Sequence, residues 1–392
     1  MSSPSFEVSY FGKTNFRNFN IRFGIKQADR LFHFYALGKT GSGKTSLLKY
    51  LMQQDLVASR GFTFLDVHGD ACSELFSKLS DSTKEKVIYL DVTNPDLQWG
   101  YNPFRKVKPS QRSLVASNIL EILKRNWKSA WGMKMEHILR YCLLTLLEQP
   151  KANFADLSRI LQDPSFRRGC LNHVSNKDIR AFWELEFPKY RPGDLLPILN
   201  KTGAFLAHPM VRKVLVENSR QLSLRSIMDK EQVLLINLAK GQVGTDVAHI
   251  LGSLLLTSLA SSAFSRIDTP YHLRKPFFIY LDEFQTLSNT DLLAEMLSEL
   301  RKFKVGLILA NQFLSQLEPE VRASLLGNVG TIVSFRCSIA DASLLVKEFI
   351  PLGIPKYEIA DFTSLANFEV YLKLMINGKP SRAFSAETFR PH

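Results

Sequence analysis

Residues 38–45 read GKTGSGKT, and this stretch decides the fold. It matches the phosphate-binding pattern G-x-x-x-x-G-K-[ST] throughout. The apolar run LFHFYALG (31–38) precedes it, and the helical pattern SLLKYLMQQDL (46–56) follows it. A strand, a glycine-rich turn and a helix in this order form the context in which the pattern is specific. The sequence therefore predicts a P-loop domain, with a chance glycine-rich turn as the weaker alternative.

The residues of the loop suit a nucleotide phosphate. Its glycines let backbone N–H groups face phosphate oxygens at a helix N-terminus. Lys44 is placed to reach the β- and γ-phosphates, and Thr45 to offer its hydroxyl to Mg²⁺. We therefore expect ATP and Mg²⁺ as cofactors. The predicted nucleotide-binding residues are Gly38, Lys39, Thr40, Gly41, Ser42, Gly43, Lys44, Thr45 and Ser46.

A second stretch, FFIYLDEF (277–284), ends an apolar strand in two carboxylates. We expect Asp282 to hold the magnesium ion with its water shell, and Glu283 to polarise the attacking water. The alternative is that the pair caps the helix predicted over 289–297. That alternative is weaker, because 288–291 already offers a cap.

The next apolar strand, VGLILAN (305–311), is followed by Gln312. Side chains at the carboxyl ends of neighbouring parallel strands converge on the ligand crevice of an α/β sheet. Gln312 is therefore a candidate for sensing the γ-phosphate or orienting water. Its alternative is an ordinary surface glutamine.

Seven short apolar runs alternate with helical patterns, which predicts an α/β fold with a mainly parallel sheet covered on both faces. The runs lie at 31–38, 61–67, 86–92, 232–238, 276–284, 305–311 and 331–336. The last stretch contains Asn377-Gly378 and predicts a β-hairpin. Helical spacing alone fills 109–225. We therefore divide the chain into a first part of the P-loop domain (1–108), an all-helical insertion (109–225) and a second part of the P-loop domain (226–392).

The positive charge is concentrated in this insertion. The chain has a net charge of +13, and residues 105–225 contribute 22 Lys and Arg against 10 Asp and Glu. A solvated helical surface is one interpretation. A polyanion partner is the other, because such a field attracts phosphates. The candidate DNA-contacting residues are Lys124, Arg125, Lys128, Arg167 and Arg168.

The remaining composition points to a cytoplasmic protein. The four cysteines show no CxxC spacing, which fits a reducing compartment and gives no zinc site. The first residues lack the apolar segment of a signal peptide. The apolar stretch 247–264 contains His249 and several Ser and Thr residues, so we expect a buried helix and no membrane span.

Several longer motifs resemble the FtsK/HerA branch of P-loop ATPases, and within it the conjugative coupling proteins of the VirD4/TraD/TraG kind. The resemblance covers roughly residues 11 to 375. Besides the two stretches above, it is carried by DVHGD (66–70), NPF (102–104), LLINLAKGQVG (234–244), LILANQFLSQL (307–317) and GNVGTIVSFRCSIADA (327–342). The sequence departs from the family at Val67, where DPHGD-type members have proline, and in having only about 37 residues before the loop.

The resemblance implies a RecA-like ATPase that forms a ring, most simply a homo-hexamer, and moves DNA through its pore. It also implies that Arg301, on the segment between Asp282 and Gln312, acts as an arginine finger in a neighbouring subunit. Arg336 and Lys347 are weaker candidates for the same role, and a surface charge is the alternative for all three.

We therefore expect an ATP-driven DNA translocase serving conjugative transfer, mobile-element transfer or DNA processing. The DNA partner is single- or double-stranded. A nuclease, a relaxase or a secretion apparatus is the expected protein partner, and through it the chain is peripheral to the inner membrane. One alternative is a nucleotide-dependent scaffold or switch that moves no DNA. A second is an ATPase that delivers protein substrates to a secretion apparatus.

Overall fold

In the computed structural model, the described residues are 7–18, 20–105, 107–287, 290–349 and 357–391. The chain forms two compact units. The sheet unit comprises Met1–Leu90, Leu224–Asn237 and Leu259–His392, and the helical unit comprises Asp91–Ser223 and Leu238–Ser258. The helical unit thus begins before residue 109. It also takes in 238–258, which the sequence pattern places in the second part of the P-loop domain.

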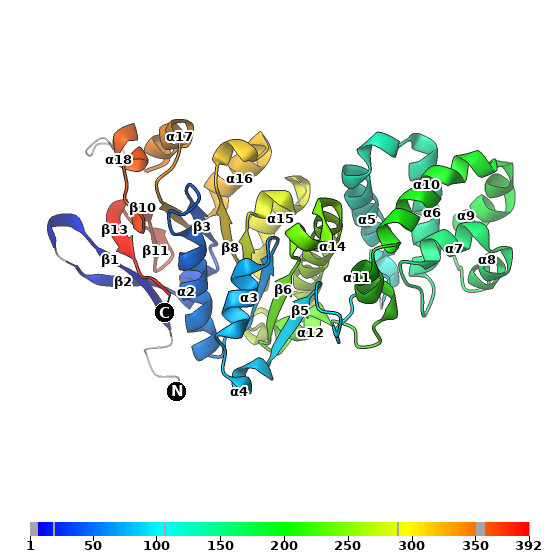
Figure 1. Cartoon of the computed structure of the whole chain (residues 1–392), viewed down its shortest axis with the longest axis horizontal. Helices are drawn as coiled ribbons and strands as arrows, with labels where there is room; N and C mark the ends of the chain where they lie inside the picture. The colour runs from blue at the N-terminus through cyan, green and yellow to red at the C-terminus, as the bar shows by residue number, and fades with distance from the viewer. Residues whose placement is uncertain (1–6, 19, 106, 288–289, 350–356, 392) are drawn as a thin grey trace. The chain divides into compact units, whose positions relative to one another are not determined.

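The sheet unit is built on one large sheet (Figure 1). Within the described residues this sheet has eleven strands, in the order β2-β1-β13-β10-β9-β3-β8-β7-β4-β6-β5. Their bounds are β1 Val8–Thr14, β2 Arg22–Lys26, β3 Phe34–Leu37, β4 Phe62–Asp66, β5 Val87–Asp91, β6 Val233–Asn237, β7 Phe277–Asp282, β8 Val305–Asn311, β9 Thr331–Ser334, β10 Glu369–Lys373 and β13 Phe384–Thr388.

All seven strands predicted from apolar runs are present, as β3 to β9. Every residue of β3, β4, β6, β8 and β9 is buried, as continuous apolar strands covered on both faces should be. β9, β3, β8, β7, β4 and β6 pair in parallel. The carboxyl ends of these strands therefore lie along one edge of the sheet, which we call the carboxyl edge.

The other end of the sheet is antiparallel. The N-terminal strands β1 and β2, which the apolar pattern did not predict, pair with each other, and β1 pairs with β13. β13 also pairs with β10, and a short ladder joins β11 (Met375–Ile376) to β12 (Lys379–Pro380). Asn377 and Gly378 have φ of 51° and 76° in the turn between β11 and β12, so the predicted hairpin is confirmed.

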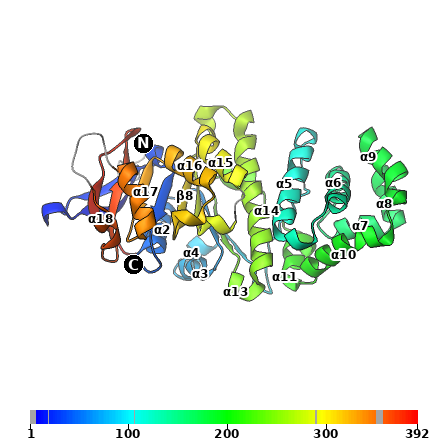
Figure 2. The same ribbon diagram turned by 90° about the horizontal axis from the view of Figure 1, so that it is seen from above.

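The helices of the sheet unit cover both faces. α2 and α3 lie on one face, and α15 and α16 lie on the other (Figures 1 and 2). This follows from right-handed crossovers, because the chain first moves from β3 to β4 and β5, and later returns through β7 and β8 to β9. The helix bounds are α1 Gln27–Arg30, α2 Lys44–Val57, α3 Asp70–Ser77, α4 Asp81–Lys84, α12 Leu224–Asp229, α15 Thr290–Glu299, α16 Pro319–Asn328, α17 Ile339–Phe349 and α18 Ile359–Thr363.

The helical unit packs around α6, which contacts α5, α7, α8, α9 and α10. Ile138, Leu139, Leu143 and Leu146 of α6 are fully buried. Two π-helical segments, Phe182–Glu186 and Lys213–Glu217, directly follow α9 and α11. The bounds are α5 Arg112–Asn126, α6 Met133–Leu147, α7 Asp156–Gln162, α8 Pro164–Leu171, α9 Lys177–Ala181, α10 Pro192–Leu206, α11 Pro209–Arg212 and α13 Lys240–Val243.

One long helix, α14 (Thr245–Phe264), contains the apolar stretch noted in the sequence. Together with the turn to Asp268, it is long and apolar enough to cross a membrane, and 56% of its most apolar window is buried inside the structure. The core helix of a soluble protein passes the same test of length and composition.

Candidate functional site

The loop between β3 and α2 depends on its glycines. A Cβ on Gly38 would lie 2.6 Å from the Cβ of Phe335, which is closer than two such atoms approach. Gly41 and Gly43 have φ of 76° and 125°. Glycine adopts these conformations without steric cost. Close packing at Gly38 and positive φ at Gly41 and Gly43 therefore explain why the turn has glycine at these positions.

Two neighbouring strand ends hold the loop at the carboxyl edge. The N–H of Gly38 donates to the carbonyl of Asn311 at 3.4 Å, at the end of β8. The N–H of Lys39 donates to the carbonyl of Arg336 at 2.8 Å, just after β9. The start of the loop is thus tied to strands on both sides of β3.

Lys44 and Thr45 begin α2 and face the end of β7. Lys44 Nζ donates to the carbonyl of Gly38 at 2.5 Å. Thr45 Oγ1 donates to Asp282 Oδ2 at 2.6 Å. The other carboxylate oxygen, Asp282 Oδ1, is buried and has no hydrogen-bond partner in the described part of the chain. A hydroxyl and a buried carboxylate are ligands that Mg²⁺ accepts, so Thr45 and Asp282 fit this ion.

Charge accumulates at this point of the carboxyl edge. Burial is the main reason why the pKa of Asp282 rises to about 6, and the nearby carboxylates of Glu283 and Asp66 raise it further. Burial also lowers the pKa of Lys44, although Asp282 and Glu283 oppose that shift. Three carboxylates beside a single buried lysine favour an added cation.

Glu283 sits immediately beyond β7 in an unusual backbone conformation. Its φ is 54°, which is uncommon for a residue other than glycine and occurs often at functional sites. Gln285 Nε2 donates to Glu283 Oε2 at 2.6 Å and so fixes the direction of the carboxylate. The argument against a helix cap by Asp282 and Glu283 involves residues 288–291, of which Ser288 and Asn289 lie outside the described residues.

Gln312 follows β8 at the carboxyl edge and is half-buried. The preceding Asn311 is fully buried, and its amide group accepts from the Tyr35 hydroxyl at 2.5 Å and donates to the Phe313 carbonyl at 2.9 Å. These bonds hold the end of β8. Gln312 thus shares this edge with Lys44, Thr45, Asp282 and Glu283.

Arg301 does not join them. It lies in a 3₁₀ turn, Leu300–Phe303, immediately before β8 and therefore at the opposite edge of the sheet. Its guanidinium lies over the ring of Phe32, 3.3 Å from the centroid, and the residue is exposed. Within one subunit, Arg301 is separated from the loop by the length of β8.

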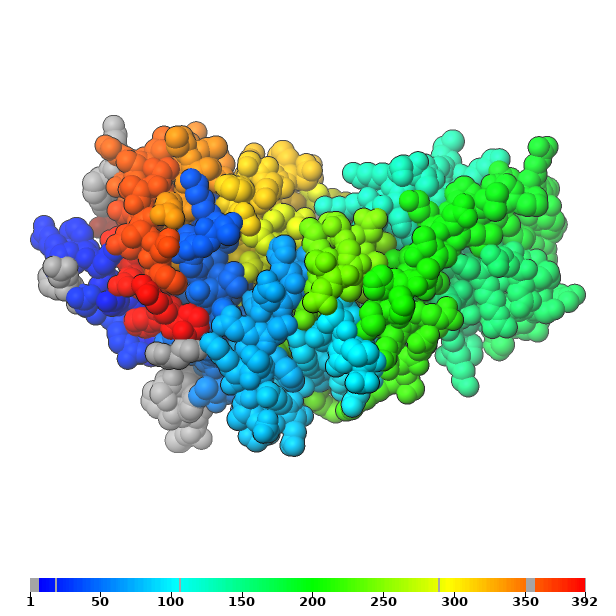
Figure 3. Space-filling model, in the orientation of Figure 1, coloured from blue at the N-terminus to red at the C-terminus, as the bar shows by residue number. Residues whose placement is uncertain are grey.

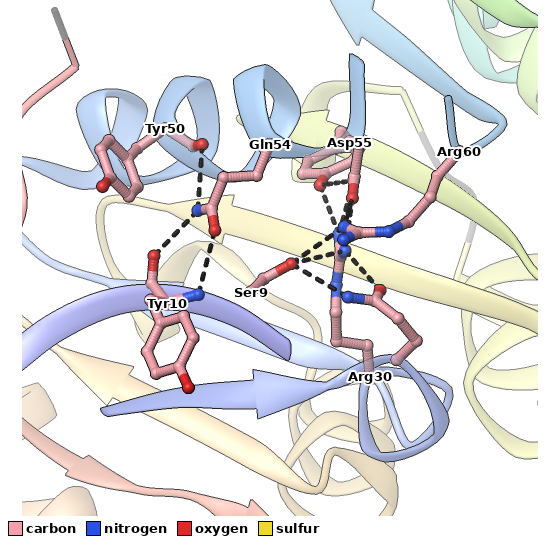
Figure 4. Close-up of polar contacts among 9 residues, drawn as sticks. Ser9, Tyr10, Arg30, Tyr50, Gln54, Asp55 and Arg60 are labelled. Carbon is pink, nitrogen blue, oxygen red and sulfur yellow. Dashed lines mark hydrogen bonds and ion pairs between the residues drawn. The ribbon is translucent and has the colours of Figure 1, made fainter. Parts of the chain in front are cut away.

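A buried ion-pair network joins α2 to β7 away from the carboxyl edge. Arg30 is fully buried and binds both oxygens of Asp55, on α2, at 2.7 and 2.8 Å (Figure 4). The Tyr280 hydroxyl, on β7, donates to Asp55 Oδ2 at 2.5 Å. Burial alone would raise the pKa of Asp55, but the paired arginines hold it below its ordinary value. The network therefore fixes α2, which carries Lys44, against the strand that carries Asp282.

Two neighbours of the loop were missed by reasoning from sequence. Asp66 ends β4 directly beside Asp282 and accepts from the N–H of Cys72 at 2.9 Å. The DVHGD stretch pointed to it without giving a role. The sequence offered Arg336 only as a residue acting on the site of a neighbouring subunit. In the structure its carbonyl accepts from the N–H of Lys39 in the loop of the same chain. Its guanidinium donates to Asn367 Oδ1 at 3.1 Å.

Comparison with known protein families places these features in one group. The family model described as "Type IV secretion-system coupling protein DNA-binding domain" matches residues 24–353. The chain belongs to this family. The resemblance seen in the sequence is therefore confirmed.

Several solved structures share the fold. The plasmid coupling protein TrwB in complex with the GTP analogue GDPNP is 17% identical, with a TM-score of 0.66 over 94% of this chain and 88% of that one. TrwB with ADP and Mg²⁺ is 18% identical, with a TM-score of 0.66 over 93% and 87%. VirB4 of Thermoanaerobacter pseudethanolicus is 13% identical, with a TM-score of 0.66 over 97% and 96%. The predicted fold class is confirmed, and a search of curated proteins finds no significant match.

Proposed function

We propose that the chain is an ATP-driven DNA translocase of the conjugative coupling kind. The observation that carries the proposal is the contact of Thr45 with Asp282 beside Lys44, at the mouth of a complete P-loop. Membership of the coupling-protein family supplies the DNA substrate. TrwB, which shares the fold, has been solved with ADP and Mg²⁺ and with an ATP analogue.

Each residue at the carboxyl edge has a proposed role in hydrolysis. Lys44 and the loop N–H groups bind the phosphates, and Thr45 and Asp282 hold the ion. When bound, Mg²⁺ supplies neutralisation of the charge on the β- and γ-phosphate oxygens. Glu283 accepts the proton of the attacking water. Gln312 orients that water, or senses the γ-phosphate, from the end of β8.

We propose that the basic insertion at 109–225 contacts DNA. Four of the five candidate residues are exposed: Lys124, Arg125, Lys128 and Arg168. Arg167 instead donates to the Ile160 carbonyl at 2.9 Å and lies over the ring of Phe187 at 4.7 Å. Its role is therefore in packing of the helical unit. The four exposed residues are the proposed phosphate contacts, and Lys124 also pairs with Glu136 at 3.5 Å.

The assembly and setting belong to the same proposal. A ring of identical subunits places Arg301 of one subunit at the site of the next, since Arg301 lies far from its own loop. We infer a cytoplasmic location, with attachment to the inner membrane through a partner such as a secretion apparatus, a relaxase or a nuclease.

The experiment that tests hydrolysis compares two substitutions. Lys44→Ala removes a phosphate-binding charge, so nucleotide binding itself should weaken. Glu283→Gln keeps the hydrogen bond from Gln285 within reach but removes the base, so ATP should still bind while phosphate release falls by about 10² or more. Binding of a fluorescent nucleotide and phosphate release are measured on the same samples. Near-normal turnover in Glu283→Gln would reject Glu283 as the base.

A further inference from the structure

Phe368, from the C-terminal part of the sheet unit, is built against the loop. It stands immediately before β10, and its N–H donates to the Ser42 carbonyl at 2.8 Å. A Cβ on Gly43 would lie 3.0 Å from the ring of Phe368. Figure 3 shows the C-terminal residues, in orange and red, against the blue segment that carries the loop and α2.

The backbone of Phe368 is strained. Its φ is +70°, a conformation that bulky residues rarely adopt. Two further hydrogen bonds, besides the one to Ser42, hold it there. The N–H of Thr388 at 2.9 Å and the hydroxyl of Thr388 at 3.2 Å both donate to the Phe368 carbonyl. A strained residue persists only where its surroundings enforce it, and such residues gather at ligand sites. These hydrogen bonds therefore hold the ring of Phe368 beside the loop.

Arg390, just after β13, lies over this ring. Its guanidinium carbon is 4.4 Å from the ring centroid, and the residue is exposed. Among the described residues, no carboxylate lies within ion-pair distance of Arg390. A flat cation backed by an aromatic ring attracts the π-face of another ring by stacking and by cation–π attraction.

We propose that Phe368 and Arg390 form the base subsite of the nucleotide site and bind a purine by stacking. The proposal rests on the nucleotide site described above. Once the loop holds the phosphates, the base lies within reach of the side of the loop where Phe368 is found. A ring and a guanidinium bind the face of a base rather than its hydrogen-bonding edge. The subsite therefore favours purines over pyrimidines for their larger stacking area, and it treats adenine and guanine alike.

The test measures the affinity of the full chain for Mg-bound ATP, GTP, CTP and inorganic tripolyphosphate by calorimetry. The wild type should bind ATP and GTP equally, and CTP more weakly. Phe368→Leu and Arg390→Ala should each lower the affinity for ATP and for GTP by about 10-fold, the scale of one base–aromatic stack. Both should leave the affinity for tripolyphosphate unchanged, and the ratio of ATP affinity to CTP affinity should fall. Phe368→Tyr, which keeps the ring, should restore the wild-type ratio.

Phe389→Leu is the matched control, because the ring of Phe389 packs 5.7 Å from Tyr50 instead of against the loop. It should leave all four affinities unchanged. Equal weakening of ATP and tripolyphosphate in Phe368→Leu would overturn the base subsite, leaving Phe368 as support for the loop. A wild type that binds ATP no better than tripolyphosphate would overturn it as well. A wild type that binds neither would instead overturn the proposed function itself.

Discussion

At the scale of single residues, the proposed role of Asp282 as a magnesium ligand predicts that nucleotide binding depends on pH. Burial raises its pKa to about 6, so the carboxyl is ionised at pH 7.5 and mostly protonated at pH 5. A protonated carboxyl does not ligate a cation. The Mg²⁺ concentration needed for half-maximal ADP binding should therefore rise about 10-fold as the pH falls one unit below the pKa of Asp282. Fluorescent-nucleotide titrations at several Mg²⁺ concentrations measure this.

Asp282→Asn supplies the control for this prediction. The phosphates of the nucleotide also titrate near neutral pH, and the slope that remains in Asp282→Asn reports their share. The wild type should show the steeper pH dependence. Identical slopes in the two proteins would mean that Asp282 does not hold the cation.

At the scale of elements, His33 joins the end of α15 to the start of β8. Its Nε2 donates to the Leu297 carbonyl at 3.0 Å, and its Nδ1 accepts from the N–H of Leu307 at 2.9 Å. The second bond needs the neutral ring, because both nitrogens of a protonated imidazole are donors. Burial lowers the pKa of His33 to about 4.

This shift predicts how the stability of the sheet unit changes with pH. Since the folded pKa is below that of the unfolded chain, the unfolded state binds the proton first as the pH falls. The contribution of neutral His33 is complete above about pH 6.5 and is lost towards pH 4, by about 1.4 kcal/mol per pH unit. The unfolding temperatures of the wild type and of His33→Gln should therefore converge as the pH falls through this range. Parallel curves would show that His33 titrates normally.

The elements also show what the sequence can and cannot predict. The seven apolar strands and the Asn377-Gly378 hairpin were found because burial on both faces and a tight turn leave local patterns. The strands β1 and β2 were missed because polar and apolar residues are mixed in them. They pair with each other, and β1 joins the sheet by pairing with distant β13. The same reason separates the two halves of the site. Lys44, Thr45 and Asp282 follow from motifs, whereas Phe368 contacts the loop from the other end of the chain and Arg390 lies over its ring.

At the scale of the whole molecule, the position of Arg301 predicts shared sites. Arg301 lies at the edge of the sheet opposite its own loop, so its proposed role as an arginine finger requires a neighbouring subunit. An arginine supplied in this way contributes on the order of 10³-fold to turnover. Arg301→Ala should bind ATP nearly normally and hydrolyse it very slowly.

Mixing two inactive proteins, Arg301→Ala and Lys44→Ala, tests this sharing. In a mixed ring some interfaces combine an intact loop with an intact arginine, and these should regain turnover. Mixed rings that form yet stay inactive would count against the role of Arg301. Doping wild-type rings with Lys44→Ala subunits is the control, since strictly coupled sites would lose activity more steeply than in proportion.

The central claim, that ATP hydrolysis by this chain moves DNA, is tested most directly by the ATPase rate with and without DNA on a sample of known oligomeric state. We predict that DNA raises the rate in the ring form and that the stimulation falls steeply with salt, because the contacts are to phosphates. Reversing the charges at Lys128 and Arg168 should flatten that salt dependence. An ATPase rate that DNA leaves unchanged, in rings that demonstrably form, would contradict the account and favour a nucleotide-dependent scaffold.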